Sequence, residues 1–205
     1  MARPLIVLGT NNRKKGIELA ELLEPVGIAV RTLADFDRKT EVVEDGDTFA
    51  ANAAKKATRQ AQFLGHWVLG EDSGLSIDSL GGAPGVYSAR FSGEGADDAS
   101  NNRLLLEKLG SLPIEKRTGH YTCHATLADP EGRIRAESEG VCRGRIRFTP
   151  SGNGGFGYDP LFEVVEYHRT FGEMSGAVKQ CISHRAKALR CLIAQLPALL
   201  GEIGR

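Results

Sequence analysis

The chain has 205 residues, of which 41% are hydrophobic and 25% are charged, and its formal net charge is zero. This composition is that of one globular domain, or one domain with two lobes, and it supplies enough apolar residues for a sizeable core. Without a net positive charge the protein has no overall field to attract a nucleic-acid backbone or an anionic membrane. Recognition of a phosphate would therefore depend on a few local charges.

The chain starts with Met-Ala-Arg-Pro and runs directly into an apolar strand, and no apolar run is long enough to span a bilayer. We therefore expect no signal peptide, no membrane contact and a cytoplasmic location. The four cysteines have no metal-ligand spacing, which favours free thiols over a disulfide or a metal site. They are Cys123, Cys142, Cys181 and Cys191.

The first part of the chain alternates short apolar runs with helical patterns. We expect strands at residues 5–8, 28–33, 67–69 and 75–78, helices over 14–23 and from Asp47 or Thr48 to Gly65, and a loop at 70–74. The second part adds helices and a hairpin. We expect a helix over 98–109, strands over 119–128 and 133–146 around a turn at 129–132, and a final helix over 177–196. This pattern predicts the α/β class with a mixed sheet.

The first candidate loop is residues 10–15, where the first expected strand gives way to a helix. Free backbone N–H groups and the helix dipole favour an anion at such a point, and Lys15 adds a full charge. The glycine spacing of a Walker A loop is absent. The structural alternative is a solvated basic helix N-terminus.

The second candidate loop is Glu71-Asp72-Ser73-Gly74, which follows a buried strand. Two adjacent carboxylates repel each other, so they favour a bound cation or a raised pKa. Mg²⁺ often binds one or two carboxylates together with substrate phosphates, and Glu44 in the acidic segment 41–47 could supply another ligand. The alternative for that segment is a solvated acidic loop and helix cap.

The third candidate combines the glycine-rich residues 152–160 with Ser183-His184-Arg185. The glycines allow positive φ and a close approach to a ligand, and Phe156 offers a flat apolar ring. Arg185 can donate two hydrogen bonds to a carbonyl-bearing base or a phosphate, and Lys179 could reach the same site. These features suit a planar anionic ligand such as a nucleotide. A surface turn followed by a basic helix is the alternative.

Motifs along nearly the whole chain resemble those of the inosine triphosphate pyrophosphatase (Ham1-like) family, in the family's order. They are Thr10-x-Asn12-x-x-Lys15, Glu44-Asp-Gly-Asp-Thr-Phe49, Glu71-Asp-Ser-Gly-Leu75, Gly81-Gly-Ala-Pro-Gly-Val-Tyr-Ser-Ala-Arg90, Gly154-Gly-Phe-Gly-Tyr-Asp-Pro160, Thr170-Phe-Gly-Glu-Met174 and Ile182-Ser-His-Arg185. Several of these motifs are long, which makes the resemblance specific.

The resemblance implies an elongated α/β fold, with a long mixed sheet and flanking helices. Residues 1–205 would form one domain with two lobes and an active-site cleft between them. The resemblance also implies a homodimer and a Mg²⁺-dependent nucleoside triphosphate pyrophosphohydrolase. This enzyme would hydrolyse ITP, dITP and XTP to the monophosphate and pyrophosphate, removing non-standard purine nucleotides from the pool. Nucleic acid and membranes would not be partners.

Roles for single residues are carried over from the family by motif position. Asp72 would be the proton acceptor and a metal ligand, and Glu44 would be a second acidic ligand. Phosphate or sugar would be bound by Thr10, Asn11, Asn12, Arg13, Lys14, Lys15, Ser73 and Lys179. The base would be surrounded by Phe156, Gly157, Tyr158, Asp159, His184 and Arg185.

Three positions depart from the family pattern. Glu71 stands where members often have Asp, and the extra methylene moves the charge, which weakens the case for a metal role of Glu71. Ala51 removes a carboxylate that the family often carries, and Asn11 replaces a commoner small residue. None of these changes removes the proposed base, Asp72.

Two other functions stay open from the sequence. One is a related pyrophosphatase that acts on other abnormal nucleotides, such as modified pyrimidines. The other is a nucleotide-binding protein without catalysis, against which the carboxylates of Glu44 and Asp72 argue, because binding alone does not need a proton acceptor. For purine selection, donors on His184 and Arg185 would satisfy a C6 carbonyl, whereas the amino group of adenine would face them donor to donor.

Overall fold

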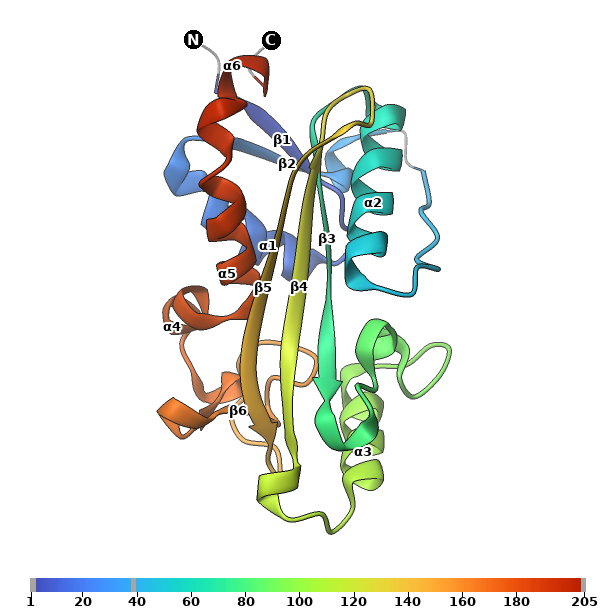
Figure 1. Cartoon of the computed structure of the whole chain (residues 1–205), viewed down its shortest axis with the longest axis vertical. Helices are drawn as coiled ribbons and strands as arrows, with labels where there is room; N and C mark the ends of the chain where they lie inside the picture. Colours follow the sequence, from blue (N-terminus) through green and yellow to red (C-terminus); the bar gives the residue numbers. More distant parts are fainter. Residues whose placement is uncertain (1–2, 38–39, 204–205) are drawn as a thin grey trace. The chain divides into compact units, whose positions relative to one another are not determined.

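The computed structural model describes residues 3–37 and 40–203, which form an α/β fold around one mixed sheet (Figure 1). The strands are β1 (Leu5–Leu8), β2 (Ala29–Thr32), β3 (Val68–Ile77), β4 (Thr118–Ala128), β5 (Ile134–Ile146), β6 (Phe162–Val164) and β7 (Arg169–Thr170). Their order in the sheet is β2-β1-β3-β4-β5-β6-β7. β1 pairs in parallel with β2 and β3, whereas β6 pairs antiparallel with β5 and β7, which confirms the predicted mixed sheet.

The α-helices are α1 (Arg13–Leu23), α2 (Phe49–Leu64), α3 (Asp98–Leu109), α4 (Gly176–Ile182), α5 (His184–Ile193) and α6 (Leu200–Ile203). The sequence signals at the ends of α2 act as predicted. The Thr48 side chain accepts a hydrogen bond from the backbone N–H of Ala51, and Gly65 ends the helix with a φ of 66°. None of the helices in the described residues is long and apolar enough to cross a membrane.

Internal contacts divide the chain into two compact units. Of the described residues, the first unit contains 3–37, 40–72, 123–140 and 185–203, and the second contains 73–122 and 141–184. In the first unit, Ile6 of β1 belongs to the same core cluster as Leu19 of α1 and Leu189 of α5, whereas Val7 clusters with Ala57 of α2. Helices therefore cover both faces of the sheet at β1, which explains its continuous apolar sequence.

The core of the second unit gathers around α3 and an aromatic group. Leu105 and Leu109 of α3 cluster with Leu75 of β3, and the rings of Tyr121 and Phe162 meet edge to face at 4.8 Å between centroids. Cys123, Cys142, Cys181 and Cys191 are not joined in disulfides in the structure. The expected elongated shape and the cleft between lobes stay predictions.

The predicted loop at residues 70–74 is wrong, because these residues belong to the continuous strand β3. Glycine and charged residues are turn signals by composition, but here each has a tertiary reason. At Gly70 the strand meets α2 so closely that a Cβ would lie 2.3 Å from the carbonyl oxygen of Ala53. Glu71 and Asp72 are buried strand residues, and ion pairs compensate their charges.

The single helix predicted over 177–196 is also wrong. Ser183, with φ −66° and ψ 157°, is extended and separates α4 from α5. The helix α5 consequently begins at His184. Helix α4 therefore ends at Ile182, and His184 and Arg185 lie in the first turn of α5.

Candidate active site

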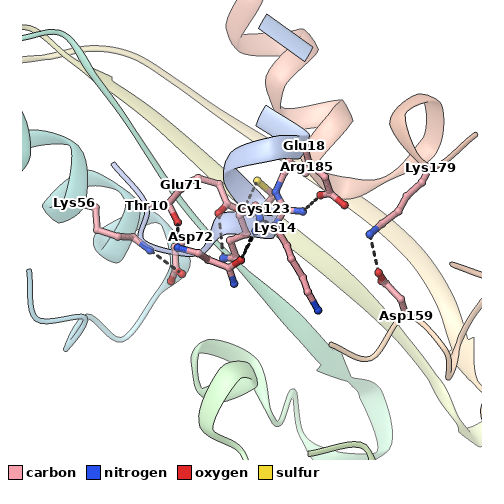
Figure 2. A network of polar contacts seen from close by, with 12 residues as sticks. Thr10, Lys14, Glu18, Lys56, Glu71, Asp72, Cys123, Asp159, Lys179 and Arg185 are labelled. Atoms are coloured by element: carbon pink, nitrogen blue, oxygen red, sulfur yellow. Dashed lines mark hydrogen bonds and ion pairs between the residues drawn. The ribbon is translucent and has the colours of Figure 1, made fainter. Parts of the chain in front are cut away.

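Asp72, the predicted base, lies on β3 in the first unit and contacts a lysine of α2. The ammonium nitrogen of Lys56 lies 3.1 Å from Oδ1 of Asp72 and 3.1 Å from Oε2 of Glu44. Figure 2 shows the Lys56 side chain reaching toward Asp72. The two predicted metal ligands therefore converge on one positive charge.

Burial and charge shift the pKa values of this group. Burial raises the pKa of the Asp72 carboxyl, Lys56 and Lys15 oppose the rise, and Glu71 and Glu44 add to it. Burial alone would lower the pKa of Lys56, but the carboxylates around it outweigh this effect and raise its pKa. Lys56 is therefore charged at neutral pH, while the Asp72 carboxyl binds a proton more readily than an ordinary aspartate.

The donor set can be compared with the needs of a metal ion. Within the described part of the chain, no group of three or more His, Cys, Asp or Glu side chains could hold a metal by itself. Glu44 and Asp72 offer two carboxylates that meet at a cationic group. That set fits Mg²⁺, which commonly takes one or two carboxylates and completes its shell with water and substrate phosphates.

Glu71, next to Asp72 on the strand, is the centre of a second charged group. Its Oε1 lies 3.0 Å from Nη2 of Arg185, and its Oε2 lies 3.1 Å from Nζ of Lys15. The thiol of Cys123 lies 3.3 Å from the same Oε1, and Arg185 also pairs with Glu18. Figure 2 shows Arg185 between the two glutamates. Glu71 therefore anchors two residues that were predicted to bind substrate.

The first candidate loop differs from the prediction in one respect. The backbone N–H groups of Lys14 and Lys15 donate to Oδ1 of Asn12 at 3.0 and 3.1 Å, so this cap occupies them and they are not free for an anion. Thr10 Oγ1 in turn accepts from the backbone N–H of Asn12 at 3.1 Å. Any charge that this loop offers to a phosphate would therefore have to come from its side chains.

The glycine-rich loop lies in the second unit and is organised by Asp159. Its Oδ2 accepts from the backbone N–H of Phe156 at 2.8 Å and pairs with Nζ of Lys179 at 2.7 Å. A Cβ on Gly155, whose φ is +74°, would lie 2.0 Å from the same oxygen. Lys179 Nζ lies 4.8 Å from the centroid of the Phe156 ring. These contacts fix the aromatic residue and the cation together.

The other predicted base-site residues of the second unit are also held in place. The His184 ring stacks on Tyr121 with 4.6 Å between centroids and 7° between planes. The Tyr158 hydroxyl donates to the carbonyl oxygen of Ser88 at 2.8 Å, and the backbone N–H of Gly157 donates to Asp98 at 2.9 Å. Tyr158 therefore acts as a support for the loop.

The predicted site residues thus fall into two sets. The first unit holds residues 10–15, Glu44, Asp72 and Arg185, and the second holds Ser73, residues 156–159, Lys179 and His184. Sequence reasoning missed Lys56, Asn52 and Glu18. A sequence signal was present for the first two, because polar residues recur every four positions along the helix predicted there. No comparable signal marks Glu18, which pairs with a residue 167 positions away.

The chain belongs to the Ham1 family, whose model matches residues 6–195, and this confirms the resemblance drawn from the motifs. A relative from Rhodopirellula baltica is 53% identical over 195 residues, which are 95% of this chain and 94% of the relative. A relative from Desulforamulus reducens is 52% identical over 185 residues, which are 90% of this chain and 92% of the relative. Both relatives are named dITP/XTP pyrophosphatase.

Solved structures agree with the fold. The HAM1 protein of Coxiella burnetii has a TM-score of 0.83 at 36% identity and covers 97% of this chain and 98% of its own. The Ham1 protein of Staphylococcus aureus has a TM-score of 0.82 at 33% identity. The match covers 97% of this chain and 99% of the Staphylococcus aureus chain. The predicted α/β fold of this family is therefore confirmed.

Proposed function

We propose that the protein is a nucleoside triphosphate pyrophosphatase that hydrolyses ITP, dITP and XTP to the monophosphate and pyrophosphate. The observation that carries the proposal is the buried carboxylate of Asp72 with Lys56 and Glu44 beside it. This group of charges occurs in a chain that is 53% identical to a relative named dITP/XTP pyrophosphatase. Its role would be to remove non-standard purine nucleotides from the nucleotide pool.

Asp72 is proposed as the proton acceptor. It takes a proton from a water molecule, whose oxygen attacks the α-phosphorus, and the bond from that phosphorus to the bridging oxygen of pyrophosphate breaks. The burial of Asp72 and the hydrogen bond from Asn52 to its carboxylate support this role, because a fixed carboxylate can be aligned with the attacking water. Lys56 holds the carboxylate from one side and keeps it in place for the attack.

Mg²⁺ is proposed as the cofactor, with Glu44 and Asp72 as its protein ligands. The ion would supply positive charge that offsets the charge of the triphosphate and of the leaving pyrophosphate. Lys15 would add a point charge to the phosphates from the first unit, and Lys179 would do so from the second. Ser73 and the remaining residues of 10–15 would bind phosphate or sugar.

Base selection is proposed to depend on hydrogen-bond donors. The side chains of His184 and Arg185 and the backbone N–H groups near Phe156 would donate to the C6 carbonyl of hypoxanthine or xanthine. A buried donor left unpaired by adenine costs about 1–3 kcal/mol, and several together reject the analogue strongly. The ring of Phe156 would stack on the face of the base.

A nucleotide panel tests the function. Pyrophosphate release would be measured with Mg²⁺ for ITP, dITP, XTP, ATP, GTP and a set of modified pyrimidine triphosphates. We expect ITP, dITP and XTP to turn over far faster than ATP and GTP. Equal turnover of ATP and ITP would reject the donor argument, and a preference for modified pyrimidines would support the related pyrophosphatase instead. Binding without release of pyrophosphate would indicate a non-catalytic protein.

A homodimer in the cytoplasm is also part of the proposal, and family membership supports it. Light scattering at micromolar concentration would report about twice the mass of the chain, and a monomer mass would reject the dimer. The segment 81–90, which includes the exposed side chain of Tyr87, is a candidate for the dimer interface. An ordered active-site loop is an equal alternative for that segment.

A further inference from the structure

Three polar residues of α2, Asn52, Lys56 and Gln60, are spaced four residues apart and are 1%, 8% and 3% exposed. Residues at this spacing share one face of a helix. Burying polar groups costs free energy unless they are hydrogen-bonded, so such a stripe needs polar partners. Their main partner is the segment of residues 40–47, called the strap here, which forms no helix or strand.

Each residue of the stripe contacts the strap at a different point. Nε2 of Gln60 donates to the carbonyl oxygen of Thr40 at 2.8 Å, and Lys56 pairs with the middle of the strap through Glu44. At the far end, Oδ1 of Asn52 accepts from the backbone N–H of Gly46 at 2.8 Å. The helix therefore fixes the path of the segment that carries Glu44.

Asn52 differs from Gln60 because its amide also reaches the proposed base. Since the backbone N–H of Gly46 requires an acceptor, the amide oxygen of Asn52 faces the strap and the amide nitrogen faces Asp72. Nδ2 of Asn52 donates to Oδ2 of Asp72 at 3.1 Å and, over a longer 3.4 Å, to the carbonyl oxygen of Gly46. Lys56 occupies Oδ1 of the same carboxylate. One donor on each oxygen fixes the plane of the carboxylate.

The contact between Asn52 and the strap has no spare room. A Cβ on Gly46 would lie 2.7 Å from Oδ1 of Asn52 and 3.0 Å from Cβ of Ala51. The glycine thus lets the strap backbone lie directly against the amide. A single buried side chain consequently links the backbone two residues after Glu44 with the carboxylate of Asp72.

We propose that Asn52 is a positioning residue that holds Asp72 and the Glu44 strap in one arrangement, so that both carboxylates face the same reacting phosphates. The proposal rests on the function proposed above. It assigns the amide oxygen to the strap and the amide nitrogen mainly to Asp72, which the nitrogen approaches more closely than it approaches the carbonyl oxygen of Gly46. These tasks can be separated by mutation.

Two substitutions of Asn52 separate the tasks. Asn52→Asp keeps an oxygen for the N–H of Gly46 but places a second oxygen against Asp72, where the amide nitrogen donated. Asn52→Ala removes both contacts. Gln60→Ala is the matched control, because Gln60 is buried on the same face and holds the same strap but does not contact Asp72.

Two readouts are needed: kcat and KM for dITP at saturating Mg²⁺, and amide hydrogen exchange of residues 40–47 without nucleotide or metal. Loss of a residue that orients a functional carboxylate typically lowers activity by about 10- to 100-fold. We therefore expect kcat to fall by about this factor in Asn52→Asp and Asn52→Ala, and KM to stay within about threefold of the unmodified value. We expect faster exchange of the strap in Asn52→Ala and Gln60→Ala. In Asn52→Asp we expect a smaller increase than in Asn52→Ala, because this variant keeps the acceptor for the N–H of Gly46 and loses only the longer hydrogen bond to the carbonyl oxygen of Gly46. In Gln60→Ala we expect kcat within about threefold of the unmodified protein.

A kcat for Asn52→Asp that stays within about threefold of the unmodified value would overturn the role at Asp72. So would a loss in Gln60→Ala as large as that in Asn52→Asp, because the effect would then be a general loosening of the strap. Unchanged exchange in Asn52→Ala would overturn the role at the strap. If the unmodified protein hydrolyses none of the nucleotides, the proposed function fails, while the exchange measurements still decide whether Asn52 holds the strap.

Discussion

Glu71 and Arg185 form an ion pair that is closed to solvent, with Oε1 and Nη2 3.0 Å apart and side chains 0% and 2% exposed. The two residues lie 114 positions apart in sequence, on β3 and at the start of α5. Removing one charge of a buried pair is more costly than losing a surface pair, because the charge that stays behind loses compensation that water cannot replace. Without Glu71, Arg185 would still pair with Glu18. The pair therefore ties α5 to the strand that carries Asp72.

The first prediction concerns this pair. Glu71→Gln keeps the shape of the side chain but leaves Arg185 and Lys15 without their shared counter-charge, and we expect a loss of about 3 kcal/mol in the free energy of unfolding. Urea unfolding would measure it. The control is Glu131→Gln, which removes a pair with Arg133 whose side chains are 63% and 69% exposed. That control should cost at most about 1 kcal/mol. Equal effects would show that burial of the Glu71 pair is unimportant.

The second prediction concerns the proposed base. Asp72→Asn is nearly isosteric but cannot accept the proton, so kcat for ITP and dITP should fall by about 10²–10⁴. Pyrophosphate release under single-substrate conditions would measure the change. Asp78→Asn, at a half-exposed carboxylate in the second unit, is the control and should keep normal turnover. Near-normal turnover of Asp72→Asn would remove Asp72 from its assigned role.

The third prediction concerns the phosphates. Lys15→Met removes a charge that Glu71 holds in place, and losing a hydrogen bond to a charged group costs about 1.5–3 kcal/mol, so KM for dITP should rise by about 10- to 100-fold. Binding of the monophosphate dIMP should weaken less, because it carries fewer charges. Calorimetric titration of dIMP beside dITP kinetics would compare the two. The control is Lys116→Met at an exposed lysine. An equal loss for both nucleotides would argue against contact with the β- and γ-phosphates.

The fourth prediction concerns pH and the second unit. Hydrogen bonds from Arg145 and Arg147 lower the pKa of Glu163 in the folded state. The unfolded state then binds more protons between the two pKa values, so these ion pairs stabilise the protein above the ordinary glutamate pKa of 4.5. The stabilisation is lost as pH falls through the lowered folded value. Urea unfolding over this acidic range should show that the free energy of unfolding falls less steeply with decreasing pH in Glu163→Gln than in the unmodified protein. The same pH dependence in both proteins would contradict a stabilising role of the ionised Glu163.

Much of the fold follows from local signals, and the failures have tertiary causes. The helix predicted over 98–109 matches α3, whose start is capped by the side chain of Asp97. The end of α2 at Gly65 was predicted for the same kind of local reason. The continuity of β3 was missed, because the close approach of α2 at Gly70 and the ion pairs of Glu71 depend on residues distant in sequence.

The candidate site shows the same division. Motif positions gave Asp72 and Glu44, but not the lysine that joins them, because Lys56 belongs to none of the motifs and lies inside the predicted helix. Its role depends on the strap and β3 meeting at one face of α2. The spacing of Asn52, Lys56 and Gln60 could have indicated this face, since a helix with two adjacent buried stripes, one apolar and one polar, requires two partners.

The close contact at Gly70 has a consequence for protein engineering. The position admits no side chain, because an added carbon would overlap the main chain of α2 at Ala53 and Ala57. Gly70 lies two residues before Asp72 in sequence. Any replacement of Gly70 has to push α2 outward, and Asn52 and Lys56 would move with the helix. Libraries that aim to change nucleotide preference should therefore hold residue 70 constant. Random mutagenesis should return substitutions there only among inactive clones.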